Sequence, residues 1–91
     1  MDMQTTVQRN LLQYHVQYAM FCQRCRGILD IRSAVSIDAH EGDRHVAAIY
    51  CAQCADGLLE SLRRAAAAQG FELEISDGRE LFPRRKGGRR K

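Results

Sequence analysis

The sequence lacks the features of membrane, secreted and multidomain proteins. No apolar run approaches the roughly 18 residues of a membrane-spanning helix, and the N-terminal MDMQTTVQRN lacks the basic and then apolar segments of a secretory signal. A length of 91 residues corresponds to one domain and excludes a two-domain enzyme. We therefore expect a cytoplasmic protein that does not enter a membrane and whose cysteine thiols stay reduced.

Sequence signatures of catalysis are also missing. The chain has no GxSxG nucleophile motif, no glycine-rich phosphate-binding loop and no Cys–His nucleophile spacing. A second metal or catalytic centre would need the residues near the middle of the chain, Asp38, His40, Asp43 and His45. Turns favour aspartate and glycine for backbone reasons alone, so this cluster is typical of a turn. We therefore expect no enzymatic activity.

Four cysteines form two CxxC pairs, Cys22–Cys25 and Cys51–Cys54, with 25 residues between them. A tight turn with two residues between cysteines directs both sulfurs to one point, and four thiolates close a tetrahedral shell around Zn²⁺. Zinc contributes about 10 to 16 kcal/mol in such peptides, which is enough to organise a chain with a small core. The sequence therefore predicts one structural zinc ion bound by Cys22, Cys25, Cys51 and Cys54. Two disulfides, a redox dithiol and an iron centre with the same ligands are the alternatives.

The hydrophobic pattern predicts a small α+β domain. A helix of low stability is expected within residues 1–13, and residues 14–20 alternate as a strand. Strands over 29–37 and 45–50, joined by a turn at 39–43, predict an antiparallel hairpin that brings the cysteine pairs together. A helix follows from about Gln53 to a cap at Gly70, and residues 71–75 and 81–82 predict a short C-terminal strand pair. We divide the chain into an N-terminal segment (1–13), a zinc-binding domain (14–83) and a basic disordered tail (84–91).

This order of elements resembles the treble-clef zinc fingers. A first knuckle, CQRC, is followed by a hairpin over 28–50 and by a second pair, CAQC, that opens directly into a helix. The resemblance covers about residues 18–69 and implies that the second two ligands come from the start of the helix. A zinc ribbon, in which the second knuckle lies on another hairpin, is the alternative, and the helical pattern after Cys54 favours the treble clef. Treble-clef domains serve as nucleic-acid binders, protein adaptors and in some cases nucleases, so the resemblance implies a scaffold and not a task.

Positive charge is concentrated at the C-terminal end. The chain has a net charge of +3, but its last eight residues contain six cations, so the rest of the chain is net negative. A segment of this kind repels itself and has no apolar residue to bury, which predicts disorder when it is free. Cations that contact phosphates release counterions and bind DNA or RNA without sequence preference. We predict a nucleic-acid interface formed by two arginines of the first knuckle and six tail residues: Arg24, Arg26, Arg84, Arg85, Lys86, Arg89, Arg90 and Lys91.

Together these patterns predict a small, non-enzymatic zinc-finger protein that binds nucleic acid as a regulatory or accessory factor. Its arginine and alanine usage is typical of a GC-rich bacterial or phage genome. The alternative is a protein-interaction adaptor or inhibitor that docks on a larger host protein through the strand at 71–75 or the outer helix face. A monomer and a homodimer are both compatible with the sequence, because a small sheet leaves a strand edge exposed.

Overall fold

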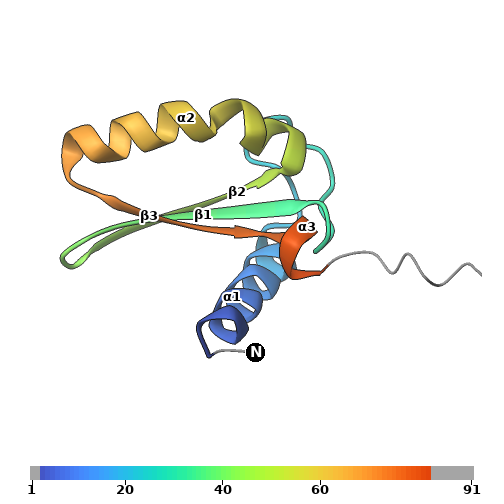
Figure 1. The fold of residues 1–91 in the computed structure, drawn as a ribbon. Helices are drawn as coiled ribbons and strands as arrows, with labels where there is room; N and C mark the ends of the chain where they lie inside the picture. Colours follow the sequence, from blue (N-terminus) through green and yellow to red (C-terminus); the bar gives the residue numbers. More distant parts are fainter. Residues whose placement is uncertain (1–2, 83–91) are drawn as a thin grey trace, which may run out of the picture.

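The computed structural model describes residues 3–82, which form a three-stranded sheet with helices on both faces (Figure 1). In chain order the elements are α1 (Met3–Ala19), β1 (Ala34–Glu41), β2 (Arg44–Cys51), α2 (Ala52–Gln69), β3 (Glu72–Asp77) and α3 (Gly78–Leu81). Within this range, no helix combines the length and the apolar character needed to cross a bilayer. The tail at 84–91, for which we predict disorder, lies outside the described residues.

The strands follow the order β2-β1-β3, and both neighbours of β1 run antiparallel to it. β1 and β2 form the predicted hairpin, whose register pairs Glu41 with Arg44 at the turn and Ala34 with Cys51 at the other end. Gly42 has a φ of 58° in this two-residue turn, a conformation that glycine adopts without steric cost. The hairpin therefore carries the second CxxC pair back to the end of the sheet where β1 begins.

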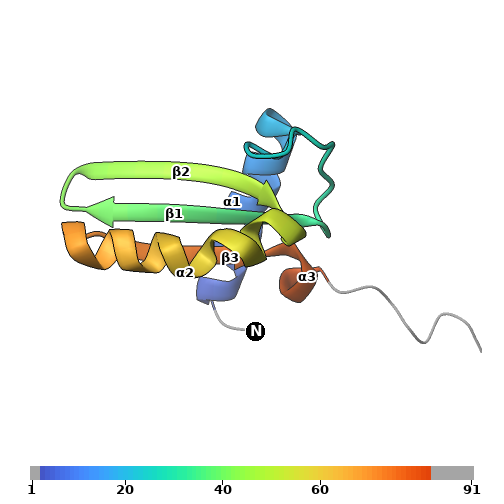
Figure 2. The same ribbon diagram turned by 90° about the horizontal axis from the view of Figure 1, so that it is seen from above.

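The two longer helices cover opposite faces of the sheet (Figures 1 and 2). α2 lies along the strands and buries Ala55 against Val35 and Ile37 of the central strand. α1 crosses the strands on the other face, where its Leu12 is buried in one cluster with Ala34. Because side chains alternate across a strand, β1 contributes to both apolar layers.

α2 confirms the helix predicted after the second cysteine pair. It begins at Ala52, directly after β2, and ends where Gly70 adopts a φ of 79°. The Gly70 amide donates to the carbonyl oxygens of Ala66 and Ala67, so the predicted glycine cap is present.

α1 overturns the strand predicted over residues 14–20. Leu12 is fully buried, and Val16 and Ala19 pack in the same cluster, so the buried positions recur at four and three residues as in a helix. The helix continues to Ala19, and Met20 leaves it with a φ of 61°. The strand prediction was wrong because Tyr14 and Tyr18, which supply much of the alternation, are exposed.

The central strand begins later than the predicted range of 29–37. Residues 31–33 form a turn, in which the Asp30 carboxylate accepts hydrogen bonds from the backbone amides of Arg32 and Ser33 at 2.8 and 3.1 Å. An aspartate side chain that binds the following amides favours a turn over a strand. Leu29 is buried in the α1 cluster, so its apolar character reflects packing against that helix and not strand alternation.

The predicted C-terminal strand pair is also wrong. β3 pairs with β1 and not with residues 81–82, which lie in and after the short helix α3. The Asp77 carboxylate accepts a hydrogen bond from the Arg79 amide at 2.9 Å and so caps the start of α3. This cap satisfies an amide that has no partner within the helix, and it favours a helical turn where the sequence predicts a hairpin.

Candidate metal centre

The first cysteine pair lies in a turn between α1 and β1. An isolated bridge between Phe21 and Ile28 closes the base of this turn. Inside it, the backbone amides of Arg24 and Cys25 each donate to the Cys22 sulfur at 3.4 Å. These hydrogen bonds favour the thiolate form of the sulfur and direct the two side chains of the pair to the same side.

The second cysteine pair lies at the junction of β2 and α2. Cys51 is the last residue of β2 and the N-cap of α2, and its sulfur accepts a hydrogen bond from the Cys54 amide at 3.4 Å. Cys54 is therefore in the first helical turn, where the unpaired amides of the helix attract negative charge. The end of β2 and the first turn of α2 therefore fix the positions of Cys51 and Cys54.

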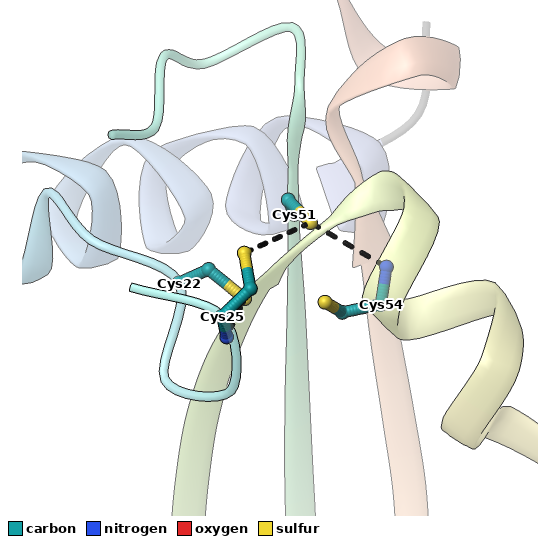
Figure 3. Close-up of side chains that lie close together, drawn as sticks. All are labelled: Cys22, Cys25, Cys51 and Cys54. Atoms are coloured by element: carbon teal, nitrogen blue, oxygen red, sulfur yellow. Dashed lines mark hydrogen bonds between the residues drawn. The ribbon is translucent and has the colours of Figure 1, made fainter. Parts of the chain in front are cut away.

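The four sulfurs converge on one point (Figure 3). All four ligand atoms lie within 4.8 Å of one another, and all four cysteines are free thiols. The Cys25 and Cys51 sulfurs, which belong to different pairs, are 3.8 Å apart. Zinc–sulfur bonds of about 2.3 Å in a tetrahedron separate the sulfurs by about 3.8 Å. Cys22, Cys25, Cys51 and Cys54 are thus positioned to bind a metal ion.

The first knuckle, residues 22–26, is docked on the edge of β2. The Gln23 amide donates to the Ile49 carbonyl oxygen at 3.0 Å, and the Ile49 amide donates to the Gln23 side-chain oxygen at 2.7 Å. This pairing satisfies both backbone groups of an edge-strand residue. Cys22 is fully buried and packs in the same cluster as Leu12. Displacement of the knuckle would therefore open the α1 face of the core.

The thiols of the centre differ in acidity. Burial raises the pKa of the Cys22 thiol, but hydrogen bonds from nearby backbone amides, that of Cys25 first, lower this pKa to about 6. The Cys54 pKa rises to about 12 because its thiol is hydrogen-bonded to Cys51, is partly desolvated and faces the charge of Cys22. At neutral pH the Cys22 sulfur therefore carries negative charge, whereas the Cys54 thiol keeps its proton. A divalent cation among the sulfurs would favour the thiolate form of Cys54.

Metal binding is expected to release protons from the centre. A metal ligand is a thiolate, so Cys54 must lose the proton that its raised pKa of about 12 retains at neutral pH. Thiols of an unfolded chain, with ordinary pKa values near 8.5, would also release protons when they bind the metal. Proton release is therefore expected whether or not the metal-free chain is folded. Titration of Zn²⁺ into weakly buffered protein with a pH indicator measures the release, and thiol-alkylated protein is the control. An affinity that does not change between about pH 6 and about pH 8 would contradict this expectation.

The two knuckle arginines, Arg24 and Arg26, are both exposed. The Arg24 guanidinium reaches toward Gly57 in the second turn of α2. The arginines that form ion pairs in residues 3–82 are others, namely Arg44, Arg64 and Arg79. The tail cations Arg84, Arg85, Lys86, Arg89, Arg90 and Lys91 lie outside the described residues, so their role remains a prediction.

The histidines and aspartates near the hairpin turn do not form a second metal cluster. Over residues 3–82, the four cysteines are the one group of potential ligands that lie within metal-binding distance of one another. Asp38 is 2% exposed and faces the His45 Nε2 atom at 3.5 Å, whereas His40 stacks on His45 and faces Glu74. These contacts are cross-strand pairs on one face of the sheet.

Sequence reasoning missed the contribution of α1 to this polar face. His15 lies with its Nε2 atom 4.0 Å from the Asp38 carboxylate, and its Nδ1 atom is hydrogen-bonded to the Ser36 hydroxyl. The available signal was the helical spacing of Leu12, Val16 and Ala19, which places His15 next to the sheet.

Comparisons of the chain with known protein families, with curated proteins and with solved structures give no match.

Proposed function

We propose that the centre binds one structural Zn²⁺ ion in a treble-clef arrangement. Four thiolates complete a tetrahedral shell and leave no open position for water or substrate, so the ion would organise the fold and not take part in a reaction. The second ligand pair begins a helix, as in a treble clef, and does not lie on a second hairpin. Metal analysis of the purified protein distinguishes zinc from iron, which the same four sulfurs also bind.

We further propose that this zinc finger is a non-enzymatic cytoplasmic protein that binds nucleic acid, as a regulatory or accessory factor of bacterial or phage type. The supporting observation is the exposure of Arg24 and Arg26 on a knuckle that the metal centre and the Gln23–Ile49 hydrogen bonds hold in place. Arginines on a rigid turn lose little entropy when they bind phosphates, and the forked guanidinium makes bidentate contacts. The tail would add six further cations close in sequence.

A protein-interaction adaptor or inhibitor is the second candidate. The observation in its favour is that β3 forms one edge of the sheet. Backbone groups at a strand edge can pair with an extended segment of another protein, and the basic tail would steer the encounter with an acidic partner. Recovery of one stoichiometric protein after nuclease treatment would favour this function over nucleic-acid binding.

Reversal of charge on the knuckle is expected to weaken binding to nucleic acid. In the variant Arg24→Glu/Arg26→Glu, two phosphate contacts are lost, so the slope of log affinity against log salt should fall by about 2 for duplex DNA. Removal of residues 84–91 should reduce the slope further and leave the metal centre loaded. Fluorescence anisotropy with duplex DNA and with single-stranded RNA, each at several salt concentrations, measures both effects.

The matched control is Arg63→Glu/Arg64→Glu, which makes the same change in net charge on the exposed side of α2. If this control weakens binding as much as the knuckle variant, the knuckle is not the interface. If the truncated chain binds as tightly as the full chain, the tail does not contact nucleic acid.

A further inference from the structure

An apolar seam runs along one flank of α1, next to the β2 edge of the sheet. It consists of residues spaced by four, three and four positions: Val7, Leu11, Tyr14 and Tyr18. These residues are 52%, 37%, 58% and 70% exposed, whereas Leu12, on the side of the same helix that packs on the sheet, is fully buried. A surface helix of a small domain normally has one apolar face, and that face is directed to the core. α1 has a second apolar face, the seam, which is not buried in the core.

The spacing of the seam is that of a coiled coil. Apolar residues at alternating intervals of three and four form the narrow stripe that packs against another helix, with side chains of each helix inserted between those of the other. The Tyr14 and Tyr18 rings lie 4.7 Å apart and present a continuous aromatic surface along the seam. Beside them, a groove of about 190 Å³ separates the two rings from Ala47 and Ala48 of β2. The seam therefore fits a helix better than it fits an extended peptide.

Charge decides which partner fits the seam. Residues 10–21 contain no lysine, arginine, aspartate or glutamate, so this part of the seam offers no cation to the phosphates of a nucleic acid. The basic tail of the chain has no apolar residue from Arg84 to Lys91 and cannot cover the seam by burial. A second α1 presents the same uncharged stripe without repulsion, and a two-fold interface requires only that a surface be complementary to itself.

The exposed area is sufficient for a stable dimer. A standard interface of about 800 Å² per partner contains about 450 Å² of apolar surface. Phe21 and Ile28, the bridged pair directly after α1, are 49% and 78% exposed and are further exposed apolar residues close to the end of the helix. At about 200 Å² for each aromatic residue, the exposed fractions of Tyr14, Tyr18 and Phe21 correspond to roughly 350 Å² together, and Val7, Leu11 and Ile28 add to this area.

We infer that two copies of this chain associate through α1, with the seam of Val7, Leu11, Tyr14 and Tyr18 at the centre of a two-fold interface. The two knuckles, each following α1 directly, would then belong to one particle. This inference does not depend on nucleic-acid binding, because the seam contains none of the arginines assigned to that role.

Sedimentation equilibrium of the full, metal-loaded and nuclease-treated chain tests the inference. We expect twice the 10.3 kDa mass of the chain, and a mass that persists at about 0.5 M salt because an apolar interface is not screened. Tyr18→Glu places a charge in the interface and should raise the dimer dissociation constant at least about 30-fold. Gln13→Glu, an equal charge change at an exposed position on another side of α1, should leave this constant unchanged.

Leu11→Gln, which adds no charge, is the second seam variant, and metal content and circular dichroism show that each variant is folded. A wild-type chain that sediments at 10.3 kDa at all concentrations would overturn the inference. So would a dimer that both seam variants retain, which would place the interface elsewhere. A dimer that dissociates at high salt or after nuclease treatment would be held together by nucleic acid, and it would overturn the inference while supporting the proposed function.

Discussion

Chelation of the metal is expected to abolish the cooperative unfolding transition of the domain. Binding of zinc by four thiolates contributes about 10 to 16 kcal/mol, which is comparable with the whole stability of about 5 to 15 kcal/mol of a folded domain. Without the ion, no metal–sulfur bonds join the two cysteine pairs, so the knuckle that buries Cys22 beside Leu12 loses this link to the start of α2. Circular dichroism during thermal or denaturant unfolding, with and without a chelator, measures the loss.

A single substitution, Cys51→Ser, should have the same effect with the metal in excess. Cys51 is both a candidate ligand and the N-cap of α2, and serine is a good N-cap. The substitution therefore removes the ligand and keeps the cap, so that a loss of structure reports on the metal site. Ser61→Ala, at an exposed position on α2, is the control and should unfold as the wild type does. A chelated chain with the wild-type spectrum and denaturation midpoint would contradict a structural role for the metal.

Gly78→Ala is expected to destabilise the domain by at least about 3 kcal/mol, at or above the upper end of the usual cost of overpacking. Gly78 is buried at the start of α3, and a Cβ atom there would lie 1.8 Å from the Ile31 carbonyl oxygen and 2.9 Å from that of Ala34. Both contacts are to backbone, which cannot turn aside as a flexible side chain can. α3 or the turn before β1 must therefore move, and the close contact between α3 and this turn is lost.

The matched control is Gly57→Ala. A Cβ atom at Gly57 meets only the flexible Arg24 side chain, at 3.8 Å. Gly57 lies inside α2, where alanine is favoured over glycine by about 0.5 to 1 kcal/mol, so this variant should be slightly more stable than the wild type. Denaturant titration of both variants in the metal-loaded state gives the two free energies of unfolding. A Gly78→Ala variant within about 1 kcal/mol of the wild type would show that the Gly78 environment is not tightly packed.

The parts of the fold that could be predicted from the sequence are those determined by residues close together in the chain. The two CxxC pairs, the glycine turn of the β1–β2 hairpin and the cap of α2 at Gly70 depend on spacing and on backbone conformations that few residues adopt. Convergence of the four sulfurs follows from these local features, because a hairpin returns the second pair to the end of the sheet where the first pair lies.

The elements that the sequence predicted wrongly depend on contacts between distant residues. Tyr14, Val16 and Tyr18 alternate as in a strand, but burial of Leu12 against Ala34 stabilises the helical period instead. Leu81 and Phe82 lie at the end of α3 and do not pair back as a strand, because α3 begins at Gly78, which packs against the backbone of Ile31, 47 positions earlier in the sequence. Asp38 and His15, 23 positions apart, meet because α1 crosses β1.

The sequence by itself therefore determined the chemistry of this protein: four thiols in two CxxC pairs, a hairpin and a helix that follow from the same pattern, and a strongly basic C-terminal end. Only the tertiary structure decided that α1 is a helix with one face on the sheet and an apolar seam along one flank. The physical reason is that ligand spacing and turn conformation are local constraints, whereas the choice between helix and strand at an ambiguous segment depends on the surface that it can bury.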